Sequence, residues 1–168
     1  ELLMYPARVY LLSNQPDLAH QQLDKLLKII PDHLDANYAK AYLQLQAKQY
    51  EAALASADKV LKVNNDHIAA HFVSAASAYS LAQYEKAFAH VAKVTYAYPA
   101  YADGLKLKAA IQFKLGDELA ATETLSGINQ SDFNQQDMEL LKAAGQALLD
   151  NEDFSLSQQL FAQAAQLA

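Results

Sequence analysis

The sequence predicts an all-α protein, built as a solenoid of antiparallel helix pairs. Three observations indicate this fold: a composition rich in helix formers, few turn-forming residues, and a repeat period of 34 residues. Of the 168 residues, 33 are Ala and 26 are Leu, whereas Gly and Pro number only 4 each. Ala and Leu are strong helix formers. The scarcity of Gly and Pro argues against a β-sandwich, a β-barrel or a disordered tail.

The period appears as like residues at a fixed spacing, which is the signature of repeat architectures. Tyr84 follows Tyr50, and His67 follows His33, by 34 residues. Two alanine ladders keep the same step: Ala7, Ala41, Ala75 and Ala109, and Ala19, Ala53, Ala87 and Ala121. The chain length of 168 therefore holds almost five units.

The period divides the chain into units 1–33, 34–67, 68–101, 102–137 and 138–168. After Gly127 the register slips by two residues, so that Gly145 takes the small-residue position of the last unit. The inserted pair lies in the polar stretch 129–136, which we expect to be a longer loop. The chain opens at Glu1 without an initiator Met. We therefore expect a single array that is part of a longer repeat protein.

The second unit shows the expected helix pair most clearly. The first helix is predicted at Leu34–Gln46, with Asp32 as its N-cap after Pro31. The second helix is predicted at Tyr50–Val63, because its apolar residues recur at steps of 3 and 4. Stacking of neighbouring units then buries the faces that a single pair leaves open.

These residues resemble the tetratricopeptide repeat (TPR) over the whole chain. The matches are a small residue in a first helix, a Tyr and an Ala in a second, and a turn residue after it: Ala41, Tyr50, Ala53 and Asn65, then Ala75, Tyr84, Ala87 and Pro99. The early aromatic of the family is replaced by Asn37, His71 and Leu105, and the Gly between the helices survives only at Gly116. The resemblance implies a right-handed superhelix whose first helices line a concave groove.

The amino-acid sequence of the repeat units is also similar to that of one bacterial branch, the TPR lipoproteins associated with PEP-CTERM/exosortase sorting. The similarity lies in residues 31–36 (PDHLDA) followed by residues 50–53 (YEAA), and in the related residues 83–87 (QYEKA) of the next unit. This resemblance implies an extracytoplasmic or periplasmic protein that is membrane-anchored when intact, with the present segment soluble. The chaperone-binding branch is not matched, because its carboxylate-clamp positions hold Met4, Arg8, Ala69 and Val73.

Composition excludes several classes of partner and site. The net charge of −6 argues against nucleic acid, since phosphate binding needs clustered Lys and Arg. No run of about 18 apolar residues exists, so we expect no direct membrane insertion in this segment. The absence of Cys excludes disulfides and thiolate metal sites. We expect no cofactor.

The sequence predicts no catalysis. It contains neither a nucleophile elbow nor a phosphate-binding glycine loop. His67 and His71 are four residues apart and share a helix face, but a metal site needs a third ligand. We therefore expect His71 to pack, and we expect His20 and His90 to be solvated or to cap helices.

Carrying the family groove over by matching position predicts a partner-binding surface. Its aromatic members are Tyr38, Tyr42, Phe72, Tyr79 and Phe113, and its basic members are Lys106, Lys114 and Lys142. Exposed rings are favoured at interfaces, and the lysines would take a carboxylate-rich end of a peptide. The alternative is that the rings pack internally and that the lysines pair locally, because Asp103 and Glu139 precede Lys106 and Lys142 by three.

The predicted function is a non-catalytic scaffold that binds a peptide or protein partner in its groove, in bacterial envelope or exopolysaccharide surface-protein sorting. Two alternatives stay open. One is a structural spacer that self-associates through an uncapped C-terminal end near Leu160 and Phe161. The other is a saccharide-binding module in which tyrosines stack on sugar rings.

Overall fold

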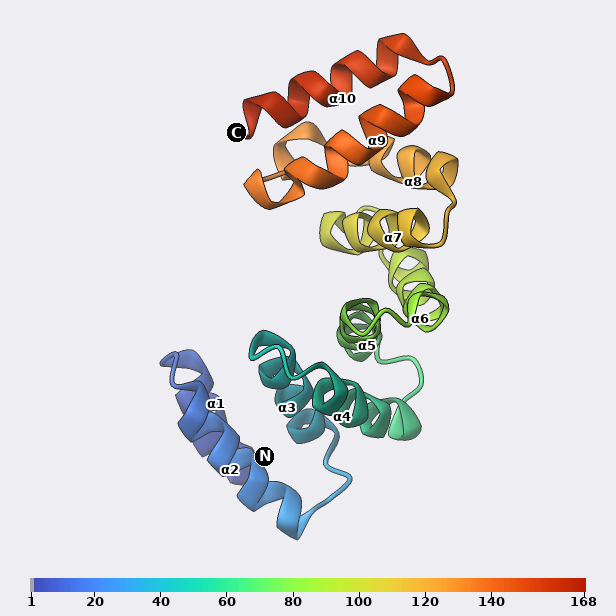
Figure 1. The fold of residues 1–168 in the computed structure, drawn as a ribbon. Coiled ribbons are helices and arrows are strands. Elements are labelled where there is room, and N and C mark those ends of the chain that lie inside the picture. The colour runs from blue at the N-terminus through green and yellow to red at the C-terminus, as the bar shows by residue number, and fades with distance from the viewer. Residues whose placement is uncertain (1) are drawn as a thin grey trace. The chain divides into compact units, whose positions relative to one another are not determined.

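The computed structural model describes residues 2–168, and these residues form ten α-helices and three short 3₁₀ segments. The helices are α1 (Tyr5–Leu12), α2 (Pro16–Ile29), α3 (Leu34–Gln46), α4 (Tyr50–Val63), α5 (Ile68–Ser80), α6 (Tyr84–Ala97), α7 (Ala102–Lys114), α8 (Glu118–Ser126), α9 (Met138–Asp150) and α10 (Phe154–Gln166). Figure 1 shows successive helices joined by short turns into antiparallel pairs. The all-α prediction is confirmed, and the bounds predicted for Leu34–Gln46 and Tyr50–Val63 are those observed.

The chain divides into two compact units, Glu1–His90 and Val91–Ala168, and the division falls inside α6. In the first unit, α1 packs on α2, α2 on α3, α3 on α4, and α4 on α5. In the second unit, α7 packs on α8, α8 on α9, and α9 on α10. Each unit therefore buries helix faces by stacking one pair on the next, as repeat proteins do.

The small residues of both ladders lie where the helices cross. All eight alanines of the two ladders are fully buried, at 0% exposure: Ala7, Ala41, Ala75, Ala109, Ala19, Ala53, Ala87 and Ala121. A side chain that ends at Cβ lets two helix axes approach to about 8–10 Å. The 34-residue period of the sequence therefore marks the residues that pack between the helices of successive pairs.

Every turn between the paired helices contains one residue in the left-handed region. Four of these residues are not glycine: Asn14 (φ 55°), Lys48 (φ 58°), Ala82 (φ 56°) and Glu152 (φ 64°). The fifth is Gly116, with φ 81°. The five positions are 34, 34, 34 and 36 residues apart, so the predicted two-residue slip before the last unit is confirmed.

The predicted N-cap of α3 is wrong by one residue. His33, not Asp32, caps the helix: its side chain accepts a hydrogen bond from the backbone N–H of Ala36 at 3.3 Å. His67 caps α5 in the same way, accepting from Ala70 at 3.1 Å. The histidines that recur at the repeat period are therefore caps, which explains their shared position.

Two buried polar residues fasten the turns between successive pairs. The Asn37 amide donates to the Pro31 carbonyl at 2.8 Å, six residues earlier. His71, one period later, contacts the Asn65 carbonyl through Nε2, also at 2.8 Å and also six residues earlier. Both side chains are 2% exposed. Each of these residues makes a hydrogen bond to the turn at a position where the TPR resemblance leads us to expect an aromatic residue.

The polar stretch 129–136 is more ordered than the predicted loop. It contains the 3₁₀ segment Gln130–Asp132 and leads into a second, Gln135–Asp137. Phe133 between them is 7% exposed and belongs to the core of the second unit. One aromatic side chain thus holds the insertion against the helices.

The C-terminal helix pair is closed by Gly145 and Ser157. The Ser157 hydroxyl donates to the Gly145 carbonyl at 2.7 Å, and the Phe161 ring lies against the Gly145 Cα. Leu160 is only 8% exposed and packs in the core, so of the two residues named for the predicted self-associating end it is the buried one. Phe161 is 37% exposed and is the partly open member of that predicted end.

We predict that Ala82→Gly raises the free energy of unfolding by about 0.5–1 kcal/mol. The left-handed conformation strains an L-residue with a Cβ but not glycine. Urea denaturation followed by circular dichroism measures the change.

The matched control is Ala55→Gly, at an exposed position inside α4. There glycine should lower stability by about 1 kcal/mol, because it is a poor helix former. Changes of the same sign at the two sites would contradict the strain at Ala82.

Candidate functional site

Helices α3 and α5 carry four of the predicted partner-binding rings in the first unit. Tyr38 and Tyr42 are one turn apart on α3, and Phe72 and Tyr79 are two turns apart on α5. Residues at these spacings share a helix face. The two helices also contact each other directly. We call Tyr38, Tyr42, Phe72 and Tyr79 the aromatic face.

The four rings differ in how far they are open to solvent. Tyr42 is 45% exposed, whereas Tyr38, Phe72 and Tyr79 are partly buried. Tyr42 is thus the member most available to a partner. The internal-packing alternative holds in part for the other three.

Tyr38 is held between α3 and the start of α5. Its ring lies 5.0 Å from the His67 ring, centroid to centroid, at 42°. Burial raises the pKa of the Tyr38 phenol above its ordinary value, and Tyr42 nearby adds to this rise. A neutral, half-buried phenol offers an apolar ring edge without a charge.

Tyr79 is held by a second tilted ring contact. Its centroid is 5.8 Å from that of Tyr84, the first residue of α6, at 55°. Tilted ring pairs at this separation are favourable. Both Tyr38 and Tyr79 are therefore oriented by neighbouring elements before any partner binds.

The side chains beneath the aromatic face are small and closely packed. Ala41, Ala53, Ala57 and Val73 form one buried cluster, and Tyr38 and Leu45 pack against it. A buried hydrogen bond of 2.7 Å from Ser56 to Gln44 ties α4 to α3. The face therefore has a rigid support, which reduces the entropy lost on binding.

Lys106 does not belong to an open basic strip. It is 8% exposed, and its Nζ donates to the Asp132 carbonyl at 2.5 Å and pairs with Asp137 at 2.7 Å. The ammonium group also lies 5.4 Å from the centroid of the Phe133 ring. The predicted local partner, Asp103, is at 4.0 Å. Lys106 is a structural residue that anchors the 129–136 insertion.

The other residues predicted to bind a partner in the second unit, Phe113, Lys114 and Lys142, make fewer structural contacts than Lys106. Phe113 packs against the core, whereas Lys114, at the end of α7, is exposed. Lys142 pairs with Glu139 at 2.9 Å, as the local alternative predicted. With Lys106 buried, no continuous strip joins the three lysines.

The histidines form a pair that the sequence did not predict. His71 and His90 face each other through Nδ1 atoms 2.8 Å apart, so His90 is not simply solvated or a cap. A carbonyl only accepts, so His71 donates from Nε2 to Asn65. A neutral His71 then accepts at Nδ1 from His90. The second helix of this pair is thereby tied to the first.

Within residues 2–168, no group of three or more His, Cys, Asp or Glu side chains is placed to hold a metal ion. In the same part of the chain, no helix combines the length and apolar character that crossing a membrane requires.

The comparisons with known proteins agree on the fold. The family profile described as "Anaphase-promoting complex, cyclosome, subunit 3", a TPR-type repeat family, matches residues 22–94. No curated protein matches the chain. The profile covers less than half of the sequence, and it includes all of α3, α4 and α5.

Solved structures of low sequence identity superimpose over almost the whole chain. A MamA fragment from Desulfovibrio magneticus RS-1 has a TM-score of 0.81 at 19% identity, covering 99% of this chain and 93% of that one. YrrB, described as a TPR protein with an unusual peptide-binding site, has 0.78 at 14%, covering 98% and 84%. A thermophilic TPR protein from Thermus thermophilus has 0.63 at 16%, covering 99% and 90%. The chain has the fold of TPR proteins.

We predict that Lys106→Met lowers the free energy of unfolding of the second unit by about 3 kcal/mol or more. The change leaves Asp137, whose side chain is 13% exposed, without its cation. Urea denaturation followed by circular dichroism measures the loss.

Lys142→Met is the matched control and should cost about 0.5 kcal/mol or less, because its ion pair is exposed. In the double variant Lys106→Met, Asp137→Asn, the second change should restore part of the stability. Equal costs at Lys106 and Lys142 would show that the buried pair is not structural.

Proposed function

We propose that this chain is a non-catalytic scaffold that holds a peptide or protein partner on the aromatic face. The observation that carries the proposal is Tyr42, a large ring 45% exposed on a rigid, preformed surface. Rings of this kind offer a large contact area at a low cost in rotamer entropy. They are enriched among the residues that dominate binding energy.

The geometry of α3 and α5 favours an elongated ligand. The two helices contact each other, and residues one or two turns apart on each helix share a face that runs along its axis. A helix or an extended segment laid across them would contact Tyr42 first and then the partly buried rings. The peptide-binding site named for YrrB, which shares the fold, supports this choice of ligand.

For the second unit we propose a separate binding surface, made of Lys114 and Lys142 with Phe113, that meets an acidic segment of a partner. Lys114 is exposed, and the Glu139 pairing of Lys142 is a surface ion pair that a ligand carboxylate can replace. Lys106 is excluded from this surface, because its ammonium group is already bound to the Asp132 carbonyl and the Asp137 carboxylate.

The setting that we propose for this scaffold is the bacterial envelope, as part of surface-protein sorting in PEP-CTERM systems. This proposal rests only on the similarity between the repeat sequences of this chain and those of the PEP-CTERM-associated lipoproteins. It implies an extracytoplasmic chain that is anchored to the membrane when intact. The proposed role is adaptor rather than enzyme, because no motif of the sequence supplies a nucleophile with its base.

We predict that a photo-crosslinkable residue at position 42 captures one partner in the native host, and that Tyr42→Ala weakens binding of that partner about tenfold or more. A central aromatic anchor typically has an effect of this size. Mass spectrometry identifies the partner, and titration with purified protein measures its affinity.

Two controls match this experiment. A crosslinker at Lys59, exposed on α4, should not capture the same partner. Tyr96→Ala removes a ring that is 90% exposed outside the aromatic face, and it should leave the affinity unchanged. Capture of only further copies of this chain would contradict the proposal and favour the spacer. Binding of an oligosaccharide that quenches tyrosine fluorescence, with no protein captured, would favour the saccharide module.

A further inference from the structure

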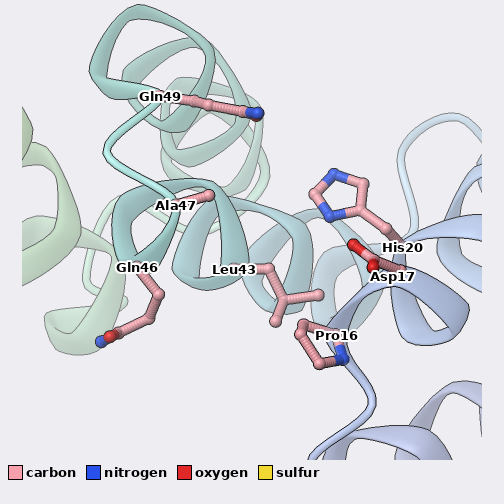
Figure 2. A pocket seen from close by; sticks show the side chains of 7 residues that line it. All are labelled: Pro16, Asp17, His20, Leu43, Gln46, Ala47 and Gln49. Atoms are coloured by element: carbon pink, nitrogen blue, oxygen red, sulfur yellow. The ribbon is translucent and has the colours of Figure 1, made fainter.

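A recess in the first unit lies between the start of α2 and the end of α3. Its volume is about 510 Å³, within the usual range of ligand sites. Seven residues line it: Pro16, Asp17, His20, Leu43, Gln46, Ala47 and Gln49 (Figure 2). We call it the α2–α3 recess.

The local sequence explains why the recess has this form. Pro16 opens α2 at a position that needs no N–H donor, and Asp17 follows in the first turn, where a carboxylate is favoured. On the other side, α3 ends at Gln46, and Lys48 in the left-handed conformation turns the chain toward α4. This turn brings Gln49 to the wall, whereas Lys48 is not among the lining residues.

The recess has an apolar part and a polar part. Figure 2 shows the Leu43 side chain directed toward Pro16, with Asp17 and His20 beside each other on α2. Asp17 and His20 are three residues apart, which places them on one helix face. Gln49 extends from the turn after α3, so that a carboxylate and an amide come from two different elements.

The lining of the recess contains an acidic residue and no strongly basic one. Among its lining residues Asp17 is the only carboxylate, and none is a lysine or an arginine. Within residues 2–168 no ion pair to Asp17 is found, whereas Asp24 pairs with Lys40 and Asp58 pairs with Lys86. An unpaired carboxylate next to an apolar floor favours a cationic ligand with an aliphatic part.

We propose that the α2–α3 recess binds an arginine side chain of a partner. The Asp17 carboxylate accepts two parallel hydrogen bonds from the guanidinium group. The methylene stem lies on Pro16 and Leu43. Arginine fits better than lysine, because its planar fork pairs with one carboxylate through two parallel hydrogen bonds.

This site goes beyond the aromatic face and does not require it. Gln46 follows Tyr42 by one helical turn, on the same side of α3. One ligand can therefore place a side chain on Tyr42 and an arginine in the recess. The recess has its own test with a small probe, so its failure is distinguishable from failure of the aromatic face.

The test is an NMR titration of the ¹⁵N-labelled whole chain with N-acetyl-L-arginine amide. We expect saturable shifts at the backbone amides of Asp17, His20, Ala47 and Gln49. N-acetyl-L-citrulline amide has the same shape without the charge, and it should bind about fivefold more weakly. High salt should weaken only the arginine probe.

Two variants give matched evidence about the carboxylate. Asp17→Asn should lower the affinity for the arginine probe about fivefold. Asp35→Asn removes the equivalent first-turn carboxylate of α3, with the same effect on a helix N-terminus, and should leave the affinity unchanged.

Four results would overturn the assignment. They are equal binding of citrulline, no effect of Asp17→Asn, shifts confined to other parts of the chain, and no saturable shift at the highest soluble concentration. Equally tight binding of N-acetyl-L-lysine amide would overturn the assignment to a guanidinium group.

Discussion

The close crossing of paired helices at small side chains is the constraint on which the rest of the structure depends. The alanines at these crossings have no solvent-exposed surface, and in the last pair Gly145 and Ser157 take their places. Because no side chain extends past Cβ at the contact, the helix backbones approach closely and their register is fixed. The left-handed turn residues follow from that register, since the chain must reverse at the same point in every pair.

The same constraint explains where polar and aromatic side chains lie. Gln44 accepts from Ser56 at 2.7 Å, and Gln112 accepts from Thr124 at 2.8 Å, which is the same cross-helix bond two periods later. In the repeat between them these positions hold Ala78 and His90, and the link runs instead from His90 to His71. The crossings are filled by small residues, and large rings such as Tyr42 lie on the solvent-exposed aromatic face instead. The support for binding is therefore built from the residues that define the period.

Much of the fold was predictable from sequence, because short-range patterns determine it. Helical periodicity gave the bounds of α3 and α4, and the spacing of small residues gave the two-residue slip that Glu152 confirms. The environment of Lys106 was not predictable in this way. Its partners Asp132 and Asp137 are 26 and 31 residues away and are brought to it by the ordered insertion. The pairing rule for residues three or four apart on a helix predicts only Asp103 as a partner. The α2–α3 recess also required the three-dimensional turn geometry, because its lining comes from separate elements.

The most direct measurement of the central claim is the stability of Ala41→Val compared with Ala55→Val, by urea denaturation. Ala41 is fully buried at the crossing of α3 and α4, and Ala55 is exposed inside α4. If small side chains set the helix approach, the first variant should lose about 1–3 kcal/mol more than the second, because added methyl groups overpack the contact. Ala55→Val should lose only the helix-propensity difference of about 0.6 kcal/mol. Equal losses at the two positions would contradict the account.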